Sequence, residues 1–240
     1  MKNIKHITII VLIAFCQCFL NQAEAQEAPR PKWDHQKIKG TRHLTYVAYT
    51  GSPFMNDTWL TGEIEFANGD IADSLNLRYS SYKDEIIYYN KEIASQIVID
   101  KASVIGFVLT EKDGHTRQFR KQYFEGILHG DRYFEVLYSG HIDLLAYRKT
   151  NLVGVSPYHD KTGVLKNMAY IDSYQFYCYS PEKGYSNVRI SKGGFYSKFT
   201  KSDQKEIRKL LRKNHLKISD EKTFIEAWKM MDEAGFQVAF

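Results

Sequence analysis

The chain has 240 residues, with 33 Lys and Arg against 28 Asp and Glu, which gives a formal net charge of +5. Charges of both signs are mixed along most of its length, with one basic stretch near the C-terminus. This balance lacks the strong positive field of a nucleic-acid-binding domain, so we expect no nucleic acid partner.

Residues 1–25 have the pattern of a secretory signal peptide. Lys2 and Lys5 precede an apolar run from residue 7 to residue 20, and Ala23-Glu24-Ala25 has the small-x-small pattern of a cleavage site. The run is shorter than the roughly 20 residues that a spanning helix needs. We therefore predict an exported protein of the periplasm or cell envelope, or of the extracellular space, that does not span a membrane.

Cleavage after residue 25 would leave 215 of the 240 residues and one cysteine, Cys178. No intramolecular disulfide can then form, and the chain is long enough to build a core without one. Free cysteines are among the most buried residues, so we expect a buried and inert thiol. We expect an N-terminal arm over residues 26–49 and a single domain over residues 50–240.

Apolar and polar residues alternate from Trp59 to Phe66, which predicts a strand with one buried face. Asn68-Gly69 then predicts a two-residue hairpin turn. Further short strands are expected at residues 44–49, 75–79, 86–89, 97–99, 105–109, 117–124, 133–138, 142–147, 170–179 and 186–191. The strands at 97–99 and 105–109 are apolar on both faces and are expected to be central, and Gly193-Gly194 is interpreted as a bulge or bend.

No long helical segment separates these strands, so parallel pairing is not expected. The predicted fold class is mainly β: an antiparallel sheet of about ten strands, arranged as a sandwich or half-barrel, with two C-terminal helices. The segment from Ser156 to Gly163 is predicted to be a loop, and it would be the boundary if the domain had two parts.

The hydrophobic period changes to 3.6 after Thr200. Ile207, Leu210 and Leu211 share one face of a basic helix that Thr200 or Ser202 can cap. A second helix is predicted to begin at Ser219-Asp220 and to end at Gly235. The basic helix would either form a solvated lid on the core or meet an anionic surface such as lipid headgroups.

No group of residues indicates a particular reaction. His141 and Asp143 share a strand face without a recognisable third ligand, so we expect no metal and no cofactor. Two carboxylate pairs are candidates for acid-base chemistry, Glu63 with Glu65 and Asp84 with Glu85. Residues two apart on a strand are about 6.6 Å apart by rise alone. That separation suits two-carboxylate hydrolysis, but any solvated strand face has the same spacing.

Trp59 lies on the same polar face as Glu63 and Glu65. An exposed aromatic residue beside charges can form a contact surface for a partner, and these three are the candidate partner-contact residues. Packing of Trp59 at the rim of the sheet is the alternative.

Three segments resemble a group of small, largely uncharacterised exported proteins of Bacteroidota. They are GSPFMNDTWLTGEIEFANG (Gly51 to Gly69), LRYSSYKDE (Leu77 to Glu85) and VIGFVL (Val104 to Leu109), and the two C-terminal helices resemble an ending of that group. The shared motifs are turns, strands and a cap, so the resemblance implies no activity and transfers no catalytic residue.

The leading hypothesis is a non-enzymatic envelope protein that binds a protein, glycan or lipid partner. One alternative is a hydrolase of envelope or extracellular polymer that uses one of the two carboxylate pairs. Another is a periplasmic lipid carrier whose curved sheet encloses an apolar cavity. Alternation of apolar residues is the same for a filled and a hollow interior, so the sequence leaves this choice open.

Overall fold

The computed structural model describes residues 37–125 and 130–239. These residues belong to one compact unit. The predicted signal peptide at 1–25 and the first part of the N-terminal arm, residues 26–36, lie outside the described residues.

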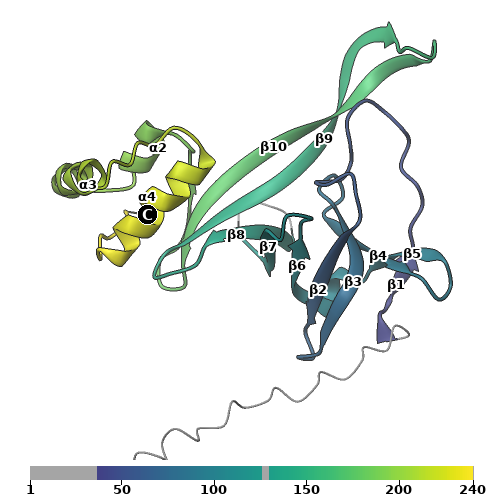
Figure 1. Cartoon of the computed structure of the whole chain (residues 1–240), viewed down its shortest axis with the longest axis horizontal. Helices are drawn as coiled ribbons and strands as arrows, with labels where there is room; N and C mark the ends of the chain where they lie inside the picture. Colours follow the sequence, from purple (N-terminus) through teal and green to yellow (C-terminus); the bar gives the residue numbers. More distant parts are fainter. Residues whose placement is uncertain (1–36, 126–129, 240) are drawn as a thin grey trace, which may run out of the picture. The chain divides into compact units, whose positions relative to one another are not determined.

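Eleven strands form one antiparallel sheet in the described part of the chain (Figure 1). Its spatial order is β1-β5-β4-β3-β2-β6-β7-β8-β9-β10-β11. The strands are β1 (Gly40–Arg42), β2 (Leu60–Phe66), β3 (Ile71–Ser80), β4 (Glu85–Asn90), β5 (Ser95–Ile99), β6 (Val104–Thr110), β7 (Thr116–Gln122), β8 (Arg132–Tyr138), β9 (Asp143–His159), β10 (Leu165–Ser180) and β11 (Gly184–Val188). The predicted antiparallel, mainly β fold class is confirmed, and the sheet is a single one rather than the two sheets of a sandwich.

The sheet is strongly curled, as distances between aromatic rings show. Tyr79 on β3 and Tyr133 on β8 are four strands apart in the sheet, yet their ring centroids are 6.3 Å apart. A flat sheet with strands spaced about 4.8 Å apart would separate them by about 19 Å. The rings of Phe107 and Phe119 contact these tyrosines and stack on each other, with their centroids 4.5 Å apart. All four rings are at most 2 % exposed, so aromatic side chains fill the concave face.

The hairpin predicted at Asn68-Gly69 forms between β2 and β3, but residues 67–69 connect the strands instead of two residues, because the Phe66 N–H donates to the Asp70 carbonyl oxygen at 2.9 Å. The Asn68 side-chain carbonyl accepts a hydrogen bond from the Asp70 N–H at 3.1 Å. Gly69 has a φ of +85°, a left-handed conformation that favours glycine. The turn sets the register in which Leu60 lies opposite Leu77 on the buried face.

Strands β9 and β10 are longer than predicted and form a two-stranded arm beyond β8 and β11 (Figure 1). The expected loop at residues 156–163 is shorter, because β9 continues to His159, which pairs with Leu165. Pro157 lies where the register slips between the pairs Tyr158–Lys166 and Gly154–Met168. A bulge tolerates proline within a strand, and for this reason the proline did not mark the end of β9.

Three smaller predictions were wrong. Residues 44–49 are not a strand, and the first strand is β1, three residues long. Leu44 and Val47, the apolar residues behind that prediction, are exposed. Strand β5 was expected to be central but pairs with the short edge strand β1. Strand β11 ends at Val188 rather than at residue 191, because Ser191 caps a short helix.

Three helices follow the sheet: α2 (Lys192–Tyr196), α3 (Lys201–Lys213) and α4 (Glu221–Glu233). The last two confirm the prediction, and Thr200 and Asp220 are their N-caps. Helix α2 was not expected, because Gly193-Gly194 indicated a bend. Gly194 is required there, since an added Cβ would lie 2.2 Å from the Arg189 carbonyl oxygen.

The helices pack on the β9–β10 end of the sheet through an apolar cluster. Trp228 of α4 is fully buried at its centre and donates from its indole N–H to the Ile142 carbonyl oxygen at 3.1 Å. The cluster also holds Leu144, Cys178, Val188, Phe195, Phe199, Ile207, Leu211, Phe224 and Met231. None of the described helices has the length and apolarity needed to cross a bilayer.

Candidate functional site

Trp59 packs at the rim of the sheet, just before β2. Its ring centroid lies 5.8 Å from that of Tyr89 on β4, and the Arg78 guanidinium lies 5.9 Å from the ring. The Trp59 side chain remains half-buried. Glu63 and Glu65 follow on the face of β2 opposite to the buried Leu60 and Ile64, so the three predicted contact residues do share one face.

Asp84 and Glu85 are adjacent in sequence but have separate partners. Asp84 is 5 % exposed, accepts from the Tyr79 hydroxyl at 2.6 Å and from the Tyr133 N–H at 3.3 Å, and forms an ion pair with Lys101. Burial raises the pKa of Asp84, although Lys101 acts against the shift. Glu85 accepts from the Tyr46 hydroxyl at 3.2 Å. Each carboxylate is therefore held by its own partners, and these contacts give both residues a structural role.

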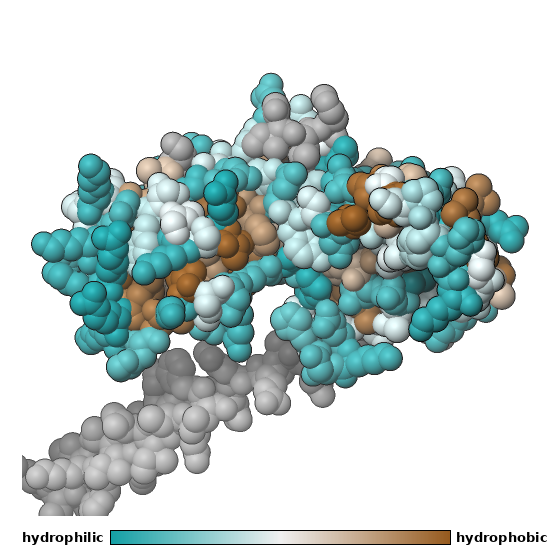
Figure 2. All heavy atoms as spheres, turned by 90° about the horizontal axis from the view of Figure 1, so that it is seen from above, coloured by the Kyte–Doolittle hydropathy of each residue, from teal (hydrophilic) through white to brown (hydrophobic). Residues whose placement is uncertain are grey.

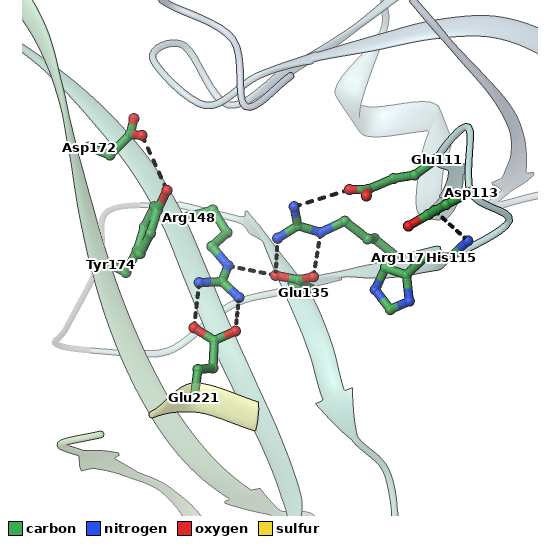
Figure 3. Close-up of polar contacts among 9 residues, drawn as sticks. All are labelled: Glu111, Asp113, His115, Arg117, Glu135, Arg148, Asp172, Tyr174 and Glu221. Atoms are coloured by element: carbon green, nitrogen blue, oxygen red, sulfur yellow. Dashed lines mark hydrogen bonds and ion pairs between the residues drawn. The ribbon is translucent and has the colours of Figure 1, made fainter. Parts of the chain in front are cut away.

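A network of charged side chains joins the sheet to the helices (Figure 3). Glu135 on β8 accepts from Arg117 on β7 at 2.6 and 2.9 Å and from the Arg148 Nε on β9 at 2.5 Å. The other two nitrogens of Arg148 bind the two carboxylate oxygens of Glu221, in the first turn of α4. The Arg148 guanidinium also lies 4.7 Å from the ring centroid of Tyr174.

This network is a structural contact that holds α4 on the sheet, and it is not an open ligand site. The side chains of Glu135 and Arg148 are each 6 % exposed, and each carboxylate and guanidinium in the pair has hydrogen-bond partners. Burial lowers the pKa of Arg148, and the hydrogen bonds that it donates to Glu221 and Glu135 more than reverse that effect and raise it. All three guanidinium nitrogens of Arg148 donate to carboxylates and the side chain is nearly buried, so the group is not presented to a ligand.

A second structural contact, a set of hydrogen bonds to Asp232, holds the last turn of α4. Asp232 is 3 % exposed and accepts from the Tyr138 hydroxyl at 3.0 Å and from the His141 N–H at 2.9 Å, both around the β8–β9 turn. A Cβ at Gly140 would lie 2.2 Å from the same Asp232 oxygen, so this turn has no space for a larger residue. The cavity beside Asp232, about 340 Å³, is lined by residues of both charge signs.

A basic groove lies on the outer side of the helices. It has a volume of about 370 Å³ and is lined by Lys192, Tyr196, Arg208, Leu211, Arg212, His215, Leu216, Lys217 and Ile218. Four of these are Lys or Arg and none is acidic. The remaining side chains are mostly apolar, and Figure 2 shows hydrophobic atoms between hydrophilic ones on the side of the molecule that carries the helices.

The charges of the groove are not neutralised by neighbours. Within the described part of the chain, none of Lys192, Arg208, Arg212 and Lys217 forms an ion pair with a carboxylate. The Arg208 guanidinium lies 4.8 Å from the Tyr196 ring centroid. Burial raises the pKa of the Tyr196 hydroxyl, and the charges of Arg208 and Arg212 act against that shift, which places both cations near the hydroxyl.

The sequence around the groove concentrates the positive charge of the protein. Residues 189–217 contain ten Lys and Arg and two acidic residues, a net of +8, whereas the whole chain has a net of +5. The rest of the chain is therefore slightly negative. The basic helix was recognised from the sequence, but the groove was not, because its walls come from α2, from α3 and from the segment that follows α3.

The fold and this groove define a class: an antiparallel β protein with a C-terminal helical cap that carries a cationic, partly apolar groove. No protein-family model, curated protein or solved structure matches the chain. The described residues hold no group of three His, Cys, Asp or Glu side chains arranged as metal ligands.

Proposed function

We propose that this is an exported, non-enzymatic binding protein of the cell envelope, and that its ligand is an anionic lipid at a membrane surface. The observation that carries the proposal is the basic groove of α2 and α3. It combines apolar side chains with four Lys and Arg side chains that form no ion pair with a carboxylate among residues 37–125 and 130–239. A lipid headgroup presents the complementary chemistry, a negative charge joined to a hydrocarbon chain.

Electrostatic attraction supplies the first part of this affinity. Basic side chains near an anionic membrane contribute about 1 kcal/mol each, and their effect falls off within a Debye length of about 8 Å at physiological salt. Lys201, Lys205, Arg208 and Arg212 recur at helical spacing along α3, so their charge continues along the helix from the groove.

The apolar side chains of the groove supply the second part. Leu216 and Tyr196 are half-buried and present apolar surface in the groove, above Leu211 and Ile218, which are already buried in the core. An acyl chain that covers such surface gains about 25 cal/mol for each Å² removed from water. A ligand with charge alone, such as a soluble phosphate, would leave this surface uncovered.

The two alternatives have less support. Neither carboxylate pair of the hydrolase hypothesis lines the groove or the cavity beside Asp232. The lipid-carrier hypothesis requires a hollow interior, and the concave face is filled by Tyr79, Phe107, Phe119 and Tyr133. Binding on the outside of the helices agrees with both observations.

Co-sedimentation with vesicles tests the proposal. The full mature chain should bind vesicles of phosphatidylcholine with phosphatidylglycerol and should not bind phosphatidylcholine alone. Arg208→Ala with Arg212→Ala should weaken binding about thirtyfold, the equivalent of about 2 kcal/mol for two lost cations.

The matched control is Lys222→Ala with Lys229→Ala on α4. Both lysines are exposed, neither lines the groove, and the change in net charge is the same. Equal weakening by the two double variants would show a general charge effect and would overturn the groove as the site. Equal binding to both kinds of vesicle would overturn the ligand class.

A further inference from the structure

A small notch opens in the sheet where β3 and β4 separate. These two strands pair from Ser80–Glu85 to Leu77–Tyr88, and their pairing ends there. Beyond that point β3 pairs with β2 on its other side, and β4 pairs with β5 on its other side. The edges of β3 and β4 that face each other beyond Leu77 and Tyr88 are therefore outside the β3–β4 ladder.

The separation has a local cause. The register of β2 and β3 slips between the pairs Gly62–Leu75 and Ile64–Ala72, so Asp73 and Ser74 lie opposite Glu63 alone. Ser74 has a φ of +54°, a left-handed conformation that is uncommon for a residue other than glycine. A bulge of this kind bends its strand and ends regular pairing. Such backbone strain occurs often at binding sites.

The notch has the size and lining of a site for one small polar ring. Its volume is about 140 Å³, and it is lined by Ser74, Leu75, Asn76, Tyr88, Tyr89, Lys91 and Glu92. The Tyr89 ring is half-buried, and the Trp59 ring lies beside it at 5.8 Å. Asn76 lines the notch as well, and its side-chain amide has two donors and an acceptor.

We infer that this notch binds one ring of a saccharide at the outer face of β2–β5. A pyranose ring has an apolar C–H face that packs on an aromatic ring and hydroxyl groups that both donate and accept hydrogen bonds. The notch offers the Tyr89 ring, the amide of Asn76 and the carboxylate of Glu92 within one lining.

The site is separate from the basic groove, since the two share no lining residue. Its ligand is neutral, whereas the groove takes an anion. The inference therefore does not depend on lipid binding, and either one can fail without the other.

Titration calorimetry with chitohexaose, cellohexaose and maltohexaose tests the inference on the full mature chain. At least one of the three should bind. Tyr89→Ala and Asn76→Ala should each weaken that binding about tenfold, because one removes the aromatic face and the other a hydrogen-bonding group. Tyr89→Phe should retain binding, since the ring face remains.

Tyr123→Ala is the matched control, because Tyr123 is 58 % exposed and lies outside the notch. It should bind as the unaltered protein does, and thermal unfolding of each variant reports whether it remains folded. The inference is overturned if none of the three saccharides binds. It is also overturned if the folded Tyr89→Ala and Asn76→Ala variants bind as tightly as the control.

Discussion

Arg148 connects three elements of the fold through one guanidinium group. It binds Glu135 on β8 and Glu221 on α4 while it lies on β9, and its side chain is 6 % exposed. A buried ion pair adds little net stability compared with apolar residues, because both charges lose their hydration. Removal of one partner is costly, since the other charge is left buried.

We therefore expect Arg148→Ala to lower the free energy of unfolding by about 3–5 kcal/mol. Urea unfolding followed by tryptophan fluorescence measures this change. Lys209→Ala is the control, because Lys209 forms an exposed pair with Glu206 and its loss should cost less than about 1 kcal/mol. If Arg148→Ala lowered the free energy of unfolding as little as the control does, the network would not be what holds α4 on the sheet.

Glu135 gives this network a pH dependence whose sign can be derived. Burial alone would raise the pKa of Glu135, but the hydrogen bond from Arg117 and the charges of Arg148 and Arg117 lower it below its usual value. A carboxyl group with a lowered pKa in the folded state stabilises the protein above its unfolded-state pKa, about 4.3. That stabilisation is lost as the pH falls through the folded-state pKa.

We expect the free energy of unfolding to fall as the pH decreases from about 5. Glu135→Gln should lose part of this dependence, since the amide does not titrate, and should be less stable at neutral pH. Urea unfolding at a series of pH values makes the comparison. A slope below pH 5 identical in the two proteins would show that other carboxylates cause the acid sensitivity.

Among the secondary-structure elements, helix α4 is fixed in place by its N-terminal cap and by two contacts with the sheet. Asp220 accepts from the Thr223 N–H at 2.9 Å, and the Thr223 hydroxyl lies 3.1 Å from the Asp220 N–H, which completes a capping box. Glu221 binds Arg148 one residue later, and Asp232 binds the β8–β9 turn at the other end. The three contacts orient Trp228 into the core.

Asp220→Ala should destabilise the protein, since it leaves N–H groups of the first turn without a partner. The midpoint of thermal unfolding should fall accordingly, by about 2–4 °C for a chain of this size. Ser202→Ala is the control, because Thr200 rather than Ser202 caps α3. A change within error for Asp220→Ala would indicate that the Arg148–Glu221 contact alone fixes the start of α4.

The elements were predictable where local chemistry decides them. The alternation from Leu60 to Phe66, the Asn68-Gly69 turn and the caps at Thr200 and Asp220 act over a few residues, and the structure has each of them. Prediction failed where distant contacts override local preference. Gly193-Gly194 is helical because Ser191 caps it and Phe195 packs in the core. Ser191 is visible in the sequence as a possible cap, but the burial of Phe195 depends on residues far along the chain.

At the scale of the whole molecule, the curl of the sheet decides what the interior can hold. The packed rings of Tyr79, Phe107, Phe119 and Tyr133 leave the outer surfaces for binding. The two surfaces that we propose lie on different parts of the fold, one on the helices and one on β2–β5. An envelope protein with both would bring an anionic membrane surface and a saccharide together.

The sequence by itself determined the antiparallel β class, the turns, the two long helices and the burial of Cys178, because each follows from hydrophobic period, turn residues or composition. Only the tertiary structure decided that Glu63, Glu65, Asp84 and Glu85 lie outside the basic groove, the cavity beside Asp232 and the notch, and that Lys192, Arg212 and Lys217 line one groove. A cavity is made by residues far apart in the chain, and local patterns carry no information about which of them meet. The charges were visible in the sequence, but their convergence depended on how the helices pack against the sheet.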